Sequence, residues 1–203
     1  MTLFNKKTAL IVLISVLVIV VGFKLSNISP SVKTSNLSNP IYKSVSTKLA
    51  TSVYGVPVRL VIPSINLNAD LESVGVTTSG AMDVPIGREN AAWFNLGPRP
   101  GQIGDAVIDG HYGFWVGGAP AVFNNLNKLS NGDIIYVEEN NGMTVAFRVS
   151  GSAIYSPTQN DTNLFVSSDN QSHLNIITCQ GIWNPSNKTY SDRLVILSNR
   201  LDT

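Results

Sequence analysis

The chain has 203 residues, of which 43% are hydrophobic and 13% are charged, and its formal net charge is +1. This length suits one domain of about 150 residues plus an additional segment, and the near-neutral charge gives no case for nucleic-acid binding. The first 58 residues hold six lysines and no acid, whereas the remainder holds 8 basic and 13 acidic residues. A cationic stretch beside a hydrophobic segment suits an anionic membrane surface, although a solvated tether has the same composition.

An apolar run from Ala9 to Phe23 follows Lys6 and Lys7. Such a run measures about 22 Å as a helix, so it needs flanking apolar residues and snorkelling lysines to span a hydrocarbon core of about 30 Å. This length is ambiguous between a signal peptide and a short anchor. Because no small-x-small cleavage site follows the run, we expect residues 1–25 to form an uncleaved transmembrane helix.

Residues 26–55 are rich in Ser, Asn, Thr and Lys and contain Pro30 and Pro40, which predicts a flexible linker. From residue 56 to residue 203 the sequence changes to short β-type runs between turn residues. One short helix is expected around Ala121–Leu129. Many short strands with frequent turn signals predict an all-β barrel or sandwich. The expected strands are Val58–Ile62, Ala106–Ile108, Ile134–Val137, Thr144–Val149, Leu174–Cys179 and Leu194–Leu197.

The chain has a single cysteine, Cys179, at the end of the apolar strand Ile176–Cys179 and directly before Gln180 and Gly181. Side chains at the ends of strands often face substrate. A lone cysteine is commonly a small buried hydrophobe, and a thiol acts as a nucleophile only where a nearby positive group favours the thiolate. The neighbours of Cys179 therefore decide between these two interpretations.

There are two histidines, and they differ in their distance from this thiol. His173 lies six residues before Cys179 on the same expected strand, which places it about 20 Å away. His111 follows another apolar strand in Asp109-Gly110-His111, so the two strand ends can meet at one rim. By elimination His111 is the candidate partner of Cys179, although a histidine beside glycine in a turn is more often a surface residue.

Arg193 begins the last expected strand, directly after Asp192. Its guanidinium stays charged and offers five donors, which suits binding of an oxyanion or of a substrate carbonyl. An arginine beside an aspartate is, however, also typical of a solvated ion pair.

These segments together resemble the sortase family over about residues 56–200. Ile176–Cys179 is similar to the family's Thr-Leu-x-Thr-Cys strand, with Asn175 and Ile176 in place of its first two residues. The other resembling segments are Ala106–His111 around the family's histidine, Tyr190–Ile196 around its arginine, and Ala92–Phe94, Pro98–Gly101, Phe123 and Leu126, which resemble class F or the related D and E classes.

The resemblance implies a closed, mostly antiparallel eight-stranded β-barrel with short helices. It also implies a cysteine transpeptidase without a cofactor, which cleaves a Leu-Pro-x-Thr-Gly-like sorting motif through a thioacyl-enzyme. Cys179 would be the nucleophile, His111 the acid and base, and Arg193 the oxyanion or substrate donor. The implied partners are surface proteins bearing the motif and an amine acceptor, either a cell-wall peptidoglycan precursor or a pilin lysine. The enzyme would be single-pass in the cell membrane, with its catalytic domain outside.

Other residues near these segments give weaker indications. Thr178 is a weak candidate for positioning the substrate peptide, although β-propensity alone would explain it. Asp109 suggests a Cys-His-Asp triad only if its side chain shares the face of His111. Tyr112, Phe114 and Trp115 suggest either an apolar wall for the motif or loop packing. No clustered acidic loop has ion-ligand spacing, so no obligate metal is expected.

Two other functions compete with this interpretation. A cell-wall transpeptidase of the L,D type carries histidine shortly before its cysteine, where this chain has Ile177 and Thr178. A degenerate barrel that only binds its partner is the second alternative. Retention of the cysteine, the histidine and the arginine in matching contexts argues against degeneration.

Overall fold

The structure is a computed structural model, and it describes residues 53–115, 117–159 and 162–202. The expected transmembrane helix at 1–25 and the linker up to residue 52 lie outside the described residues. Within the described part of the chain, no helix has the length and apolar character that crossing a membrane requires.

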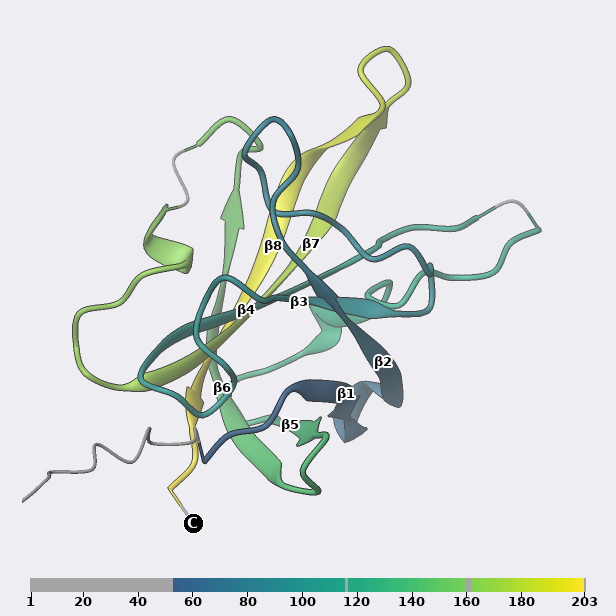
Figure 1. The fold of residues 1–203 in the computed structure, drawn as a ribbon. Coiled ribbons are helices and arrows are strands. Elements are labelled where there is room, and N and C mark those ends of the chain that lie inside the picture. The colour runs from purple at the N-terminus through teal and green to yellow at the C-terminus, as the bar shows by residue number, and fades with distance from the viewer. Residues whose placement is uncertain (1–52, 116, 160–161, 203) are drawn as a thin grey trace, which may run out of the picture. The chain divides into compact units, whose positions relative to one another are not determined.

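The described residues form eight strands that close into a barrel in the order β1-β2-β3-β4-β7-β8-β6-β5 (Figure 1). Two neighbouring pairs, β2–β3 and β4–β7, are parallel, and the other six are antiparallel. The prediction of a closed, mostly antiparallel, eight-stranded barrel is therefore confirmed. The strands are β1 (Pro57–Ile62), β2 (Leu67–Val74), β3 (Ala91–Phe94), β4 (Gly104–Gly110), β5 (Ile134–Glu139), β6 (Thr144–Tyr155), β7 (Ser172–Asn184) and β8 (Thr189–Arg200).

The helices among the described residues are three short 3-10 turns, η1 (Pro63–Ile65), η2 (Leu126–Lys128) and η3 (Thr162–Leu164). The helix expected at 121–129 is therefore wrong in extent, because only its last part forms η2. The amides of Ala121 and Phe123 donate to the carbonyls of Gly113 and His111 instead of to a helical turn. This segment is thus tied to the chain that follows β4, and Phe123 is fully buried in the core.

Alternation along the strands decides which side chains face outward. Ile108 of β4, Ile176 of β7 and Leu194 of β8 belong to the hydrophobic core inside the barrel. Their neighbours along the strands, such as Asp109 and Ile177, therefore lie on the outer face. Candidate site residues on these three strands can meet only on that face.

The connection between β6 and β7 covers part of this outer face. The side chain of Asn175 on β7 donates to the carbonyl of Leu164 at 2.8 Å, and Leu164 is buried. The ring of Phe165 packs edge-on against that of Phe94 in β3, with 5.5 Å between ring centroids. The connection thus forms a wall beside the outer surface of β4 and β7.

Residues just before the predicted domain start at 56 are already bound to the barrel. The amide of Gly55 donates to the carboxylate of Glu139 at 2.7 Å, and Glu139 is only 3% exposed. The guanidinium of Arg99 donates to the carbonyl of Tyr54 at 2.7 Å, and the Arg200 guanidinium lies over the Tyr54 ring. Burial raises the pKa of Glu139, because a buried carboxylate is costly. The hydrogen bond from the Gly55 amide offsets part of that cost.

We predict that a chain beginning at Pro57 is less stable than one beginning at Val53. Removing the Gly55 amide leaves the buried Glu139 carboxyl without that partner, at a cost of about 1–3 kcal/mol. Denaturant unfolding of both chains measures the difference, and adding Glu139→Gln to the shorter chain should recover part of the loss. Equal free energies of unfolding for the two chains would contradict this prediction.

Candidate active site

Cys179 and Arg193 lie directly opposite each other on neighbouring strands. Cys179 of β7 is the register partner of Arg193 of β8 in an antiparallel pair. Side chains opposed in this way share a face and have Cβ atoms about 5 Å apart. Both residues lie outside the barrel, because their neighbours Thr178 and Leu194 are buried. Direct strand pairing therefore brings these two residues together on one face of the sheet.

The parallel pairing of β4 with β7 brings the end of β4 next to Cys179. Gly110, the last residue of β4, is the register partner of Thr178. The hydroxyl of Thr178 donates to the carbonyl of Gly110 at 2.7 Å, and this side chain is 1% exposed. His111 is the next residue after Gly110, so the register places its backbone beside Cys179. A direct contact of Thr178 with substrate stays a prediction, whereas its bond between the two strands is a feature of the fold.

The end of β4 is held by close packing on Gly110. A Cβ atom at this position would overlap the ring of Phe123, so a larger residue would push the strand end away from the core. The amide of Phe123 in turn donates to the carbonyl of His111 at 3.0 Å. The backbone at His111 is thus fixed from the side opposite its ring.

The imidazole of His111 is oriented by the connection between β2 and β3. Its Nε2 atom lies 2.9 Å from the carbonyl oxygen of Pro85. Because a carbonyl only accepts, Nε2 carries the proton, and Nδ1 is the acceptor in the neutral ring. The ring also packs edge-on against Trp115 at 5.5 Å between centroids. Sequence reasoning missed Pro85, since a main-chain carbonyl leaves no side-chain signal.

The electrostatic surroundings of Cys179 favour the neutral thiol. Burial raises the pKa of Cys179 above its ordinary value, and the carboxyl of Asp109 raises it further, while the Arg193 guanidinium lowers it. Burial outweighs the arginine, so the resting thiol is protonated near neutral pH. A reaction at this sulfur therefore needs a base or a small thiolate population.

Asp109 lies on the same outer face, in register with Ile177 two residues before Cys179. Burial raises the pKa of Asp109 to about 7, against the opposing effects of the Gly110 amide and the Arg193 guanidinium. The carboxyl therefore changes charge near neutral pH. The ring of His111 bonds to Pro85 and not to Asp109, so the geometry gives the weaker alternative of a Cys-His-Asp triad no support.

The guanidinium of Arg193 is held by the start of its own strand. It donates to the backbone carbonyls of Asp192 at 3.0 Å and Tyr190 at 3.4 Å, and to the hydroxyl of Thr189 at 3.2 Å. The carboxylate of Asp192 accepts a bond from Ser191 instead. Arg193 is thus positioned by neutral oxygens, and its charge is not neutralised by its neighbour Asp192 as an exposed ion pair would be.

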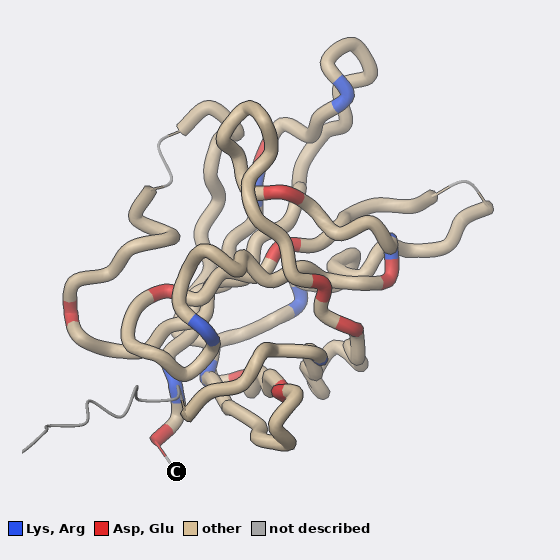
Figure 2. The backbone as a smooth tube through the Cα atoms, viewed as in Figure 1, with Lys and Arg blue, Asp and Glu red and all other residues tan. Residues whose placement is uncertain are grey.

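Figure 2 shows that the basic residues of the described chain lie on separate segments and do not gather on one face. Among these residues, no group of three His, Cys, Asp or Glu side chains is arranged to hold a metal ion.

A hollow on the outer face lies beside Arg193. Tyr155 of β6 is the register partner of Arg193, and strands are about 4.8 Å apart, so Tyr155 stands about 10 Å from Cys179. Tyr155 lines an open cavity of about 680 Å³ together with Ala153, Ile154, Gln159, Thr162 and Asn163. Tyr155 and Asn163 also line a neighbouring cavity of about 310 Å³. The two cavities share Tyr155 and Asn163, and the smaller one is also lined by His173.

Aromatic side chains stand on the other side of Cys179. The ring of Tyr190 packs edge-on against Tyr112 at 5.3 Å and against Trp183 at 5.1 Å. Phe114 is 72% exposed and Trp183 is 48% exposed. These rings belong to the chain after β4 and to the hairpin of β7 and β8, which extends beyond the barrel (Figure 1). Loop packing alone does not explain rings that are this exposed.

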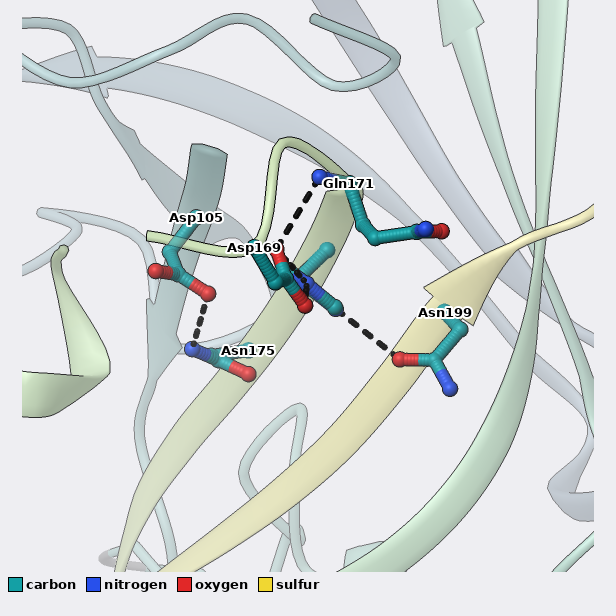
Figure 3. Close-up of polar contacts among 6 residues, drawn as sticks. Asp105, Asp169, Gln171, Asn175 and Asn199 are labelled. Carbon is teal, nitrogen blue, oxygen red and sulfur yellow. Dashed lines mark hydrogen bonds and ion pairs between the residues drawn. The ribbon is translucent and has the colours of Figure 1, made fainter. Parts of the chain in front are cut away.

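His173 lies at the opposite end of β7, as its distance from Cys179 in the sequence predicts. Its Nε2 atom is 2.9 Å from the carboxylate of Asp169, and its Nδ1 atom is 2.9 Å from the side chain of Asn199. Figure 3 shows these polar contacts beside the bond from Asn175 to Asp105. His173 belongs to this separate polar cluster and takes no part in the candidate site.

We predict that Asp109→Asn makes Cys179 easier to ionise. Removing the carboxylate removes one cause of the raised thiol pKa, so the pH midpoint of alkylation by iodoacetamide should move lower, because alkylation follows the thiolate. The measurement is the rate of mass addition to this single cysteine across pH 6–10. Asp70→Asn, which removes an exposed carboxylate paired with Arg59, is the control and should leave the midpoint unchanged. A midpoint in Asp109→Asn that stays or rises would contradict the assignment.

Comparison with known proteins identifies relatives of this barrel. A family model described as a sortase domain matches residues 60–201. Sortase C-1 from Actinomyces oris superposes with a TM-score of 0.57 at 24% identity, covering 72% of this chain and 76% of that chain. No curated protein matches the sequence.

Two further solved structures show the same fold. The lid mutant of sortase A from Corynebacterium diphtheriae has a TM-score of 0.57 at 23% identity and covers 73% of this chain and 71% of its own. Sortase C1 of Streptococcus agalactiae, in complex with MTSET, has a TM-score of 0.56 at 22% identity. The match covers 72% of this chain and 67% of that chain. At these identities the likeness concerns the fold.

Proposed function

Because the chain belongs to the sortase family, a family of cysteine transpeptidases that act on sorting motifs, we propose that it cleaves a Leu-Pro-x-Thr-Gly-like motif and transfers the acyl product to an amine. The observation that carries this proposal is the row formed on the outer face by Cys179, Arg193 and the end of β4. This row brings together a thiol, a fixed guanidinium and the backbone of His111 from three segments distant in sequence.

In the proposed reaction, the sulfur of Cys179 attacks the scissile carbonyl carbon and the C–N bond breaks. The thiol proton passes from Cys179 to His111, and the protonated His111 then gives a proton to the leaving amine. The Arg193 guanidinium stabilises the tetrahedral oxyanion. An incoming amine then attacks the thioester, its proton passes to His111, the C–S bond breaks, and His111 returns the proton to the sulfur of Cys179. The raised pKa of Cys179 supports this scheme, because such a thiol needs a proton-transfer partner.

The larger cavity, which Tyr155 lines opposite Arg193, suits the part of the motif before the scissile bond. Four extended residues span about 13 Å, which matches a path from Cys179 past Arg193 to the cavity at Tyr155. On the other side, the exposed rings of Phe114 and Trp183 offer apolar contacts. We propose that the motif lies across β7, β8 and β6 with its upstream residues in the 680 Å³ cavity.

The proposed partners are surface proteins that carry the motif and an amine acceptor, a peptidoglycan precursor or a pilin lysine. We propose a single-pass membrane enzyme with its catalytic domain outside the cell, anchored by residues 1–25. The six lysines and the apolar run of the first 58 residues support this location. The proposed subclass is F or the related D and E, on the basis of the segments at 92–94 and 98–101, since the neighbours reported above show only the fold.

We predict that the full-length chain converts one or more peptides of a Leu-Pro-x-Thr-Gly-like panel into an amine-linked product with oligoglycine. Cys179→Ala should abolish cleavage and transfer. His111→Ala should lower turnover at least about 100-fold, and Arg193→Lys about 100- to 1000-fold, since lysine lacks the guanidinium fork. Mass spectrometry measures peptide cleavage, the thioacyl adduct on Cys179 and the transfer product.

The matched controls are His173→Ala and Arg148→Lys, which change the other histidine and an exposed arginine of β6. Both should retain wild-type turnover. Near-wild-type turnover in Arg193→Lys would overturn the role of Arg193. Absence of any adduct or product with every peptide would favour the alternative of a barrel that binds without catalysis.

A further inference from the structure

The connection between β2 and β3 reaches the imidazole of His111 through one backbone atom. The carbonyl of Pro85 accepts from Nε2 at 2.9 Å, and Pro85 itself is buried. The neighbouring Ile86 is 93% exposed, so packing of the Ile86 side chain does not hold this turn in place. Burial of Pro85 and a polar contact on the two residues after it therefore hold the carbonyl against the ring.

Glu72 of β2 makes that contact. Its Oε2 atom accepts from the amide of Ile86 at 2.9 Å, and its Oε1 atom accepts from the amide of Gly87 at 3.1 Å and from the side chain of Asn90 at 2.9 Å. Both carboxylate oxygens are thus used on the two residues that follow Pro85. Glutamate is suited to this position because an ionised carboxylate only accepts, and all three groups facing it donate.

Glu72 remains charged in this setting. The bond from the Ile86 amide is the main cause that lowers the pKa of Glu72, followed by the bond from Asn90, and the charge of His111 acts in the same direction. Glu72 thus acts on His111 by holding its partner carbonyl in place.

Other bonds hold the ends of the same connection. The amide of Asp83 donates to the carbonyl of Gly75 at 3.0 Å, and the amide of Val122 donates to the carbonyl of Arg88 at 2.9 Å. These bonds do not involve the amides of Ile86 and Gly87. Loss of the Glu72 carboxylate should therefore free the turn at 85–87 and leave the barrel folded.

We infer that Glu72 is a positioning residue for His111. Through the amides of Ile86 and Gly87 it keeps the Pro85 carbonyl on Nε2, which selects the tautomer protonated at Nε2 and leaves Nδ1 to exchange the proton. This inference rests on the proposed role of His111 as acid and base. It adds a carboxylate on β2 to the site, reached through the backbone and not by direct contact with the ring.

The test compares Glu72→Gln with Glu89→Gln in the full-length chain. A glutamine at 72 offers one acceptor oxygen and turns an NH2 group toward donors. Glu89 lies in the same connection, is exposed, and pairs only with Arg88 in the contacts described for it, so its variant removes the same charge without touching the turn. Nitrogen NMR of 15N-labelled histidine reports the tautomer, and His111→Ala assigns the signals because the chain has two histidines.

In wild type and Glu89→Gln the neutral ring of His111 should be protonated at Nε2, and in Glu72→Gln it should be a mixture of tautomers. In the transfer assay, kcat of Glu72→Gln should fall about tenfold with little change in KM. This loss is smaller than the roughly 10²–10⁴-fold in rate that a general acid or base contributes, because His111 itself remains. Asn90→Ala, which removes one of the three donors to Glu72, should change the tautomer in the same direction but less.

A single Nε2-protonated tautomer in Glu72→Gln would overturn the inference, and so would equal changes in Glu72→Gln and Glu89→Gln. The NMR measurement needs no substrate. If the wild-type chain transfers no peptide, the proposed function fails while the NMR result still decides whether Glu72 positions His111.

Discussion

The site depends on the parallel register between β4 and β7. Pairing of Gly110 with Thr178 sets the end of one strand beside the thiol of the other, and the buried hydroxyl of Thr178 bridges them by donating to the Gly110 carbonyl. A shift by one residue would turn Cys179 into the barrel and Thr178 out of it. Gly110 must also lack a side chain, because Phe123 fills the space beneath it. Thr178 and Gly110 therefore decide where the thiol and the backbone of His111 meet.

The same arrangement gives a site that is unreactive at rest. The thiol is partly buried, its pKa is raised, and the arginine opposite it donates to backbone oxygens of its own strand. Asp109 adds a charge that changes near neutral pH, so the electrostatic balance around Cys179 responds to pH in this range. In the proposed reaction the thiol proton passes to His111, which the Pro85 carbonyl orients. Reactivity is in this way coupled to the connection between β2 and β3, which lies outside the strands that carry the thiol and the arginine.

The barrel class and the candidate site residues could be predicted from the sequence, because the patterns that indicate them are local. Strand alternation and turns indicated the barrel class, and the order of His111, Cys179 and Arg193 with their neighbours indicated the site. Strands β2 and β3 were not identified individually, since Leu67–Val74 is half polar and Ala91–Phe94 is very short. The expected helix at 121–129 failed because the amides of Ala121 and Phe123 bond to carbonyls after β4, a tertiary effect. Pro85 and Glu72 were missed because they act through the backbone of a distant segment. The single cysteine, in contrast, could be identified at once.

The most direct test of the register uses the fact that the chain has one cysteine. In His111→Cys, the Cα atoms of residues 111 and 179 should be about 4.4–6.8 Å apart, which is the separation that a disulfide needs. In His173→Cys, the new cysteine should lie about 20 Å from Cys179 along β7. Intact mass and thiol titration after mild oxidation count the remaining free thiols. We predict an intramolecular disulfide in His111→Cys and two free thiols in His173→Cys. Two free thiols in both variants would contradict the placement of His111 beside Cys179.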